Sequence, residues 1–322
     1  MPNTPRFNPD EVQHRESPAP NRSSAGGDAR DGRVYVYHYP NIVLAVNIAL
    51  ATGRPLLLSG PSGSGKSTLA NNVALTLGWR YYEHVVTSRT EARDLIYSFD
   101  SIGRLNDAQA NQELKHITAY IEPGVLWWAF NRNSAIERGS KGELQIASYA
   151  KDPWGYNADA RAVVLIDEID KADVDVPNNL LVPLGSLQFK VEHTGYEVAV
   201  KRDQAPLIFI TTNGERELPI AFLRRCVTIN LEKPGEDDLV KIALAKIERD
   251  RHDEPLFRDI AKHVLTQIEQ EEKEGGLPPS TAEYLDTVLA CLDLKIGIND
   301  PRFTELSNIT LRKRQNLQGG TR

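Results

Sequence analysis

The sequence is poor in several residues and patterns that mark particular classes of protein. Among 322 residues it has only two cysteines, Cys226 and Cys291, which lie far apart and match no metal-binding spacing. It contains no apolar run near the ~20 residues that a membrane span needs. Its first twenty residues lack the apolar segment of a secretory signal. We therefore expect a reduced, cytoplasmic protein without a membrane span.

An excess of basic residues is also lacking. The chain has 38 lysines and arginines against 44 acidic residues, a formal net charge of −6. A protein that binds duplex nucleic acid needs a basic face to displace counterions, so nucleic acid is not indicated as a partner. The composition, 40% hydrophobic and 25% charged, is that of a globular protein, and the length allows one large domain and a smaller one.

The middle of the chain has the pattern of an α/β domain. Residues 1–33 are rich in polar residues, proline and glycine, and we expect them to be disordered. Between residues 34 and 233, short apolar runs alternate with helical patterns, which indicates buried parallel strands joined by crossover helices. The five runs are PLLL at 55–58, YYEHVV at 81–86, AVVLI at 162–166, PLIFIT at 206–211 and CVTINL at 226–231. A five-stranded parallel sheet is therefore predicted.

The character of the sequence changes after residue 233. Apolar residues then recur at intervals of three and four over three stretches, a pattern typical of amphipathic helices. We predict a small, all-helical domain over residues 234–297. The remaining residues, 298–322, are polar and basic, and we expect a loosely ordered tail.

A glycine-rich segment, GPSGSGKS, follows the first predicted strand and precedes a predicted helix. Glycines permit backbone turns that aim successive N–H groups inward, which makes an anion-binding loop at a helix N-terminus. We expect this loop to bind a nucleoside triphosphate, with Lys66 at the β- and γ-phosphates and the Ser67 hydroxyl at one Mg²⁺ position. The predicted phosphate-binding residues are Gly60, Pro61, Ser62, Gly63, Ser64, Gly65, Lys66, Ser67 and Thr68.

An acid pair follows the third predicted strand. Asp167 and Glu168 stand where a strand ends beside the phosphate loop, so Asp167 can anchor Mg²⁺. Glu168 can orient and polarise a water for attack on the γ-phosphate. Three further acids, Asp170, Asp173 and Asp175, are expected to be first-turn and loop charges and not ligands.

An asparagine and a pair of arginines farther along the chain are weaker signals. Asn213 follows the fourth strand and can hold the attacking water or the γ-phosphate, although an asparagine before Gly214 is also typical of a turn. Arg224 and Arg225 stand before the last strand, and by themselves they would be interpreted as a solvated pair. Their position after the asparagine strand is what makes them candidates.

These elements, in this order and spacing, resemble the AAA+ ATPases and, within them, the MoxR family. YIEPGVLWWAF resembles a segment that the family carries before the acid-pair strand, and QFKVEHTGYEVAV resembles its β-hairpin. The resemblance extends over about residues 35–297, with 99–121 matching an insert in the second helix. It implies that Asn213 is a sensor, that Arg225 is a finger acting on a neighbouring subunit, that 234–297 is a lid and that the protein forms a hexameric ring.

Three phrases resemble the MoxR-type ATPases of multi-gene bacterial conflict systems: SRTEARDLIYSFD, DEIDKADVDVPNNLLVPLGS and ERELPIAFLRRCV. This resemblance implies a role in antiphage defence and an unidentified protein partner. The lid departs from the family in one respect. Where its third helix usually opens with an arginine, the chain reads PPSTAEYL, with Ala282 or Glu283 at the expected place.

Three functions remain open at this point. The first is an ATP-hydrolysing ring that remodels or activates a partner protein. The second is a switch in which ATP binding assembles a scaffold and slow hydrolysis resets it. The third is a small-molecule kinase, since GPSGSGKST also resembles the loop of nucleoside and guanylate kinases, but those enzymes lack the sensor asparagine and the finger.

Overall fold

The computed structural model describes residues 6–10, 33–110, 114–140, 152 and 161–312. Its contacts divide the chain into two compact units. The core unit comprises Met1–Arg33, Pro40–Ser59 and Lys66–Asn230, and the helical unit comprises Val34–Tyr39, Gly60–Gly65 and Leu231–Arg322. Each unit is described by itself.

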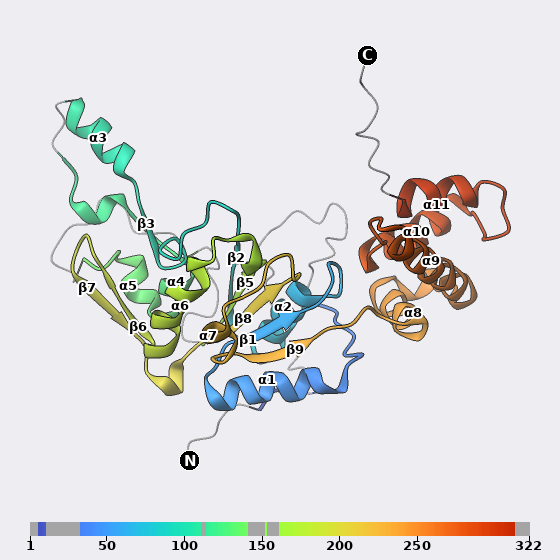
Figure 1. Ribbon diagram of the computed structural model, residues 1–322, viewed down its shortest axis with the longest axis horizontal. Helices are drawn as coiled ribbons and strands as arrows, with labels where there is room; N and C mark the ends of the chain where they lie inside the picture. Colours follow the sequence, from blue (N-terminus) through green and yellow to red (C-terminus); the bar gives the residue numbers. More distant parts are fainter. Residues whose placement is uncertain (1–5, 11–32, 111–113, 141–151, 153–160, 313–322) are drawn as a thin grey trace. The chain divides into compact units, whose positions relative to one another are not determined.

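The core unit is built on a five-stranded parallel sheet (Figure 1). Its strands, in spatial order, are β2 (Arg80–Val85), β5 (Ala162–Asp167), β8 (Leu207–Thr212), β1 (Leu56–Ser59) and β9 (Val227–Asn230). Each strand overlaps one of the five predicted apolar runs, so the predicted fold class is confirmed. Every residue of β5 and β8 is buried, which accounts for their unbroken apolar sequence.

The register of the strands brings their carboxyl ends to one edge of the sheet. Leu58 of β1 is paired with Thr211 of β8, and Ile166 of β5 with Ile210. Helix α1 (Pro40–Thr52) packs against β1 and β9, and helix α2 (Lys66–Leu77) packs against β5. Polar residues that follow β5 and β8 therefore meet beside the first turn of α2.

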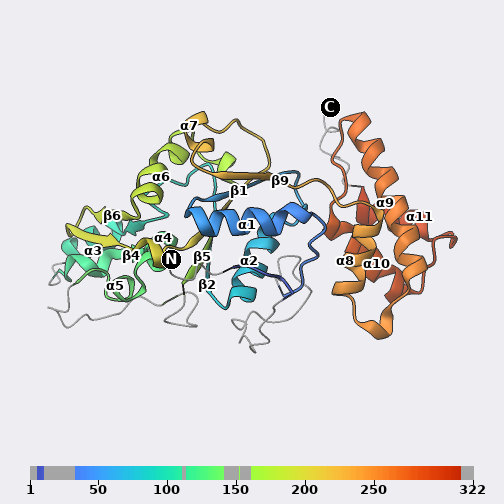
Figure 2. The same cartoon turned by 90° about the horizontal axis from the view of Figure 1, so that it is seen from below.

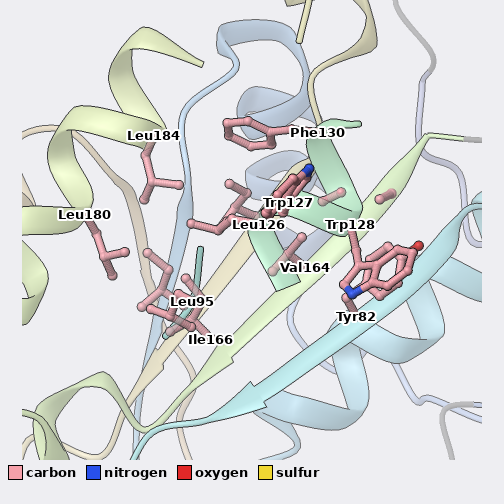
Figure 3. Close-up of a cluster of buried hydrophobic side chains, with 14 of the residues drawn as sticks. Tyr82, Leu95, Leu126, Trp127, Trp128, Phe130, Val164, Ile166, Leu180 and Leu184 are labelled. Carbon is pink, nitrogen blue, oxygen red and sulfur yellow. The ribbon is translucent and has the colours of Figure 1, made fainter. Parts of the chain in front are cut away.

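A cluster of aromatic and aliphatic side chains forms the main core (Figure 3). Trp127 and Trp128, in helix α4 (Val125–Phe130), are both buried in it. The indole N–H of Trp127 donates to the Ser134 hydroxyl at 2.9 Å, and that of Trp128 donates to the Pro123 carbonyl at 3.0 Å. Two more helices surround this region, α5 (Arg132–Ile136) and α6 (Asp175–Ser186). The tryptophans are thus packing residues with satisfied polar groups.

Two smaller elements extend from the core unit on the same side (Figure 1). One is the insert, with β3 (Tyr97–Phe99), α3 (Ser101–Gln109), η1 (Ile117–Tyr120) and β4 (Ile121–Pro123); the other is the predicted hairpin, β6 (Gln188–Val191) and β7 (Tyr196–Ala199). His193, at the turn of the hairpin, joins them. Its ring stacks on Phe99 with centroids 3.9 Å apart, and its Nδ1 lies 3.1 Å from the Tyr97 hydroxyl. Three short helices complete the described part of the unit, η2 (Ile169–Lys171), η3 (Arg202–Gln204) and α7 (Ile220–Leu223).

The helical unit contains α8 (Glu236–Lys246), η4 (Arg249–Arg251), α9 (Glu254–Glu274), α10 (Thr281–Leu294) and α11 (Phe303–Leu311), which Figure 2 shows from below. The presence of helix α11 shows that the expectation of a loosely ordered tail from residue 298 was wrong for residues 303–311. Phe303, Leu306 and Leu311 are buried in the core of the unit, so a short apolar stripe within a polar stretch was enough to form a helix. Residues 313–322 lie outside the described part. Among the described helices, none is long and apolar enough to cross a bilayer.

The amino-terminal stretch also differs in part from the expectation of disorder. Residues 1–5 and 11–32 lie outside the described part, but residues 6–10 are described, and Phe7 is 1% exposed. The Asn47 side chain of α1 accepts the N–H of Phe7 at 2.8 Å and donates to its carbonyl at 2.9 Å. The polar composition of residues 1–33 therefore gave no sign that Phe7 is buried and held by hydrogen bonds.

Candidate functional site

The glycine-rich loop, Gly60–Gly65, has the backbone that its sequence predicts. Gly60, Gly63 and Gly65 all have positive φ angles, of 145°, 78° and 85°. At Gly60 a side chain is also excluded sterically, because a Cβ there would collide with the carbonyl oxygen of Leu231. These conformations strongly favour glycine, and helix α2 begins at Lys66, directly after them. The loop thus leads into a helix N-terminus, the arrangement expected of an anion site.

The first turn of α2 supplies a cation and a hydroxyl. Lys66 is buried, and this burial lowers the pKa of its ammonium group, while the nearby carboxylates of Asp167, Asp170 and Glu168 act in the opposite direction. An ammonium group in the first turn of a helix is suited to a ligand with several negative charges. The Ser67 hydroxyl, one residue later, lies 2.9 Å from each carboxylate oxygen of Asp167.

Asp167, the last residue of β5, is buried and held from two sides. Besides Ser67, the Thr211 hydroxyl of β8 donates to its Oδ1 at 2.5 Å. Hydroxyl and carboxylate oxygens are the hard ligands that Mg²⁺ accepts together with phosphate and water. The pair of Ser67 and Asp167 therefore fits a magnesium ion brought by a nucleotide.

Glu168 lies beyond the end of β5 in a left-handed backbone conformation, with φ 61° and ψ 48°. This conformation is uncommon for a residue other than glycine and often marks a functional position. The N–H of Glu168 donates to the Thr211 hydroxyl at 2.8 Å. Its carboxylate accepts from Lys171 Nζ at 2.7 Å and from Asn213 Nδ2 at 3.2 Å. This hydrogen bond to Glu168 raises the pKa of Lys171.

The structure brings most of the predicted site residues of the core unit together. Ser67, Asp167, Glu168 and Asn213 are connected by the hydrogen bonds given above. Arg225 is not among them: Arg224 and Arg225 are exposed after α7, and within the described part of the chain neither side chain makes a hydrogen bond or an ion pair. An exposed guanidinium is available to act on another molecule.

In helix α10, which lacks the family's arginine, Glu283 caps the helix N-terminus. Glu283 is the third residue of α10, and its carboxylate accepts the backbone N–H of Ser280, the N-cap, at 2.6 Å. The Ser280 side chain completes a capping box with the backbone N–H of Glu283. Position 283 therefore serves the start of the helix.

Sequence reasoning missed three contributors to the site. Thr211 bridges Asp167 and Glu168, and its signal was a hydroxyl in an otherwise apolar strand. Lys171 binds Glu168, which the i,i+3 spacing on a short helix permits. Asp170, interpreted as a first-turn charge, is in the first turn of η2 but is also buried, unlike the exposed Asp173 and Asp175.

Comparison with known proteins gives one family match. Residues 55–226, which include the phosphate loop, the acid pair, Asn213 and Arg225, match the family described as AAA domain (dynein-related subfamily). A solved structure, a point mutant of RuvB from Thermotoga maritima, is similar at 14% identity and a TM-score of 0.44, covering 84% of this chain and 68% of that one. Among curated proteins, none matches the sequence significantly.

Proposed function

The chain belongs to the AAA domain family (dynein-related subfamily), and we propose that it is a MoxR-type ATPase that hydrolyses ATP with Mg²⁺ at this site. The observation that carries the proposal is the convergence of Ser67, Asp167, Glu168 and Asn213 at the first turn of α2, directly after the phosphate loop. These side chains come from three separate segments, and a merely structural phosphate-loop fold would not require an acid and an amide in contact there.

Each residue has a task that its surroundings support. Lys66 offsets the charge of the β- and γ-phosphates, and Ser67 and Asp167 hold Mg²⁺. The ion, when bound, neutralises charge on the phosphates during transfer. Glu168 accepts the proton of the attacking water, and Asn213 orients that water or the γ-phosphate. The hydrogen bond between Asn213 and Glu168 supports these roles, since it keeps the amide and the carboxylate side by side.

We further propose that the protein works as a ring, with six subunits as in the family it resembles. Support comes from Arg225, which is exposed and makes no side-chain hydrogen bond or ion pair within the described residues. A guanidinium from a neighbouring subunit supplies positive charge at the γ-phosphate, which a phosphate loop alone does not provide.

The location is proposed from the cysteines. Cys226 and Cys291 are free and buried, which suits a reducing compartment such as the cytoplasm.

The partner is proposed from sequence resemblance alone. The segments around 88–100, 167–186 and 215–227 resemble MoxR-type ATPases of bacterial conflict systems, which supports remodelling or activation of a partner protein in antiphage defence. A slowly hydrolysing switch is the second candidate, and one observation favours it. Both carboxylate oxygens of Glu168 already accept a hydrogen bond, from Asn213 and from Lys171, and these contacts compete with the attacking water for the same carboxylate.

The test is phosphate release by the purified protein with ATP and Mg²⁺, compared with Glu168→Gln. The amide keeps the shape of the side chain but cannot accept the proton, so the variant should bind ATP and hydrolyse it at least ~10²-fold more slowly. Equal rates in the two proteins would remove Glu168 from the mechanism. Phosphate release that rises only with added partner would favour the switch, and phosphorylation of an added nucleoside would favour a kinase.

A further inference from the structure

Asp170 is an acid that the proposed mechanism does not use. It lies in η2, two residues after Glu168, and only 2% of its surface is exposed. Removing a carboxylate from water is unfavourable by several kcal/mol unless hydrogen bonds or charges compensate. An acid buried this close to the site therefore needs hydrogen-bond donors that compensate for its lost hydration.

The partners of Asp170 are backbone groups of the loop that follows β8. Its Oδ2 accepts the N–H of Asn213 at 3.1 Å and the N–H of Glu215 at 2.9 Å. The intervening Gly214 N–H donates to the Thr212 hydroxyl at 3.0 Å. Three successive N–H groups of this loop are thus fixed, two of them by one carboxylate oxygen. Hydrogen bonds to an ionised acceptor are about twice as strong as neutral ones.

The anchored loop is also the one that carries the sensor. Asn213 donates its backbone N–H to Asp170 and its side-chain amide to Glu168, at 3.2 Å. A shift of the backbone at Asn213 would therefore change the position of the amide relative to the base. Misplacing a group by about 1 Å is sufficient to slow an enzymatic step ~10²-fold.

We propose that Asp170 is a positioning residue: through its bonds to the backbone of Asn213 and Glu215, it sets the distance between the Asn213 amide and the Glu168 carboxylate. Its effect falls on hydrolysis and leaves ATP binding nearly unchanged. The inference rests on the proposed function, because Asn213 and Glu168 matter together only if a water is activated between them.

A second role for Asp170 competes with this one. Its carboxylate also acts electrostatically on Lys66, and its Oδ1 is buried without a hydrogen-bond partner among the described residues. If the charge served mainly to support Lys66, neutralising it would weaken ATP binding. Asp170→Asn separates the roles, because the amide keeps an oxygen for the two N–H groups and loses the charge.

The experiment compares Asp170→Asn, Asp170→Ala and Asp170→Leu, the last filling the space without an acceptor. Asp175→Asn, at an exposed acid of α6, is the matched control. We expect kcat to fall at least ~10-fold and up to ~10²-fold in the alanine and leucine variants, with Kd for ATP within about threefold. Asp170→Asn should keep most of the activity. A weakened Kd with normal kcat, in the asparagine variant above all, would overturn the proposal.

A double-mutant cycle tests whether Asp170 acts through Asn213. In an Asn213→Ala background, Asp170→Ala should lower kcat by less than about twofold, because there is no amide left to misplace. The same fold loss in both backgrounds would refute the assignment.

Hydrogen exchange of residues 213–215 gives a readout that needs no ATPase activity. The amides of Asn213 and Glu215 should exchange faster in Asp170→Leu than in Asp175→Asn, even if the wild-type protein hydrolyses no ATP. Unchanged exchange would show that Asp170 does not hold the loop. An inactive wild-type protein with this exchange pattern would contradict the proposed function and leave the anchoring intact.

Discussion

The hydroxyl of Ser67 lies 2.9 Å from both carboxylate oxygens of Asp167, although 100 residues separate them in the chain. The contact arises because α2 follows β1 in the chain, and β5 is separated from β1 only by β8. Thr211 of that intervening strand donates to the same carboxylate. The oxygen ligands proposed for Mg²⁺ are thus placed by strand order, and not by the loop alone.

Thr211→Val tests this bridge. Thr211 is fully buried, and valine keeps its shape but leaves the Glu168 N–H without its hydroxyl acceptor and removes one of the two hydroxyl donors to Asp167 Oδ1, the other being Ser67. We expect the free energy of unfolding to fall by about 1–3 kcal/mol and hydrolysis to require more Mg²⁺. Urea denaturation and a magnesium titration of the ATPase rate measure the two effects. Thr228→Val, at an exposed position of β9, should change neither, and equal behaviour of the two variants would contradict the role of Thr211.

Lys66→Ala should abolish tight ATP binding. The substitution removes a cation assigned to the β- and γ-phosphates, and a charge-assisted hydrogen bond of this kind contributes roughly 1.5–3 kcal/mol, or at least ~10-fold in Kd. Calorimetric titration with ATP and Mg²⁺ is the measurement. Lys190→Ala, at an exposed lysine of the hairpin, is the control. A nearly unchanged affinity of Lys66→Ala for ATP would contradict the assignment of the phosphate loop.

Arg225→Ala should bind ATP but hydrolyse it ~10³- to 10⁵-fold more slowly, the range found for arginine fingers. Because the residue is proposed to act on a neighbouring subunit, activity per subunit should rise steeply with protein concentration. Mixing Arg225→Ala with Lys66→Ala is the sharper test, since some interfaces then pair an intact loop with an intact finger. Activity regained in the mixture supports action between subunits. Full ATPase activity of a dilute, monomeric protein would contradict the proposal that the protein works as a ring.

His263 should make the stability of the protein depend on pH. Its Nε2 lies 2.7 Å from the Ser307 hydroxyl of α11, and its ring meets Phe303. Burial lowers the pKa of His263, and the positive charge of Arg312 lowers it further. The folded protein therefore binds fewer protons than the unfolded chain below pH ~6.5, so the free energy of unfolding falls as the pH drops through that range.

The matched variant for this prediction is His263→Gln, which cannot titrate. Thermal unfolding of both proteins near pH 7.5 and near pH 5.5, on either side of the ordinary histidine pKa of about 6.5, gives the comparison. The loss of stability on acidification should be smaller in the variant. His84, whose pKa is also lowered by burial, leaves a residual pH dependence in both proteins. An identical acid sensitivity would mean that His263 does not contribute.

The elements that the sequence predicted best are those whose signal is local. The central strands β5 and β8 were visible because all of their residues are buried, and the loop because its positive φ angles favour glycine. The acid pair followed from its position at the end of β5. Each of these features depends on neighbours in the chain, so a short window of sequence contained it.

What the sequence did not predict depends on distant partners. Asp170 resembles Asp173 and Asp175 in sequence, and only the loop after β8, 43 residues on, distinguishes it by supplying N–H groups. Helix α11 was missed because its polar residues outnumber the few that reach the core of the helical unit. At position 283 the sequence showed only that the family's arginine is missing. The hydrogen bond by which Glu283 caps the helix is made to the backbone N–H of Ser280. Tertiary contacts decide such positions.

The burial of Phe7 determines where the protein can be shortened. A truncation at residue 34, where the apolar pattern of the sequence begins, would delete this side chain together with its two hydrogen bonds to Asn47. Burying a phenylalanine contributes about 1.5–3 kcal/mol, and the truncation would also remove the two backbone partners of the Asn47 side chain. Crystallisation and expression trials that start the chain at residue 34 would thus produce a less stable protein than one that keeps Phe7.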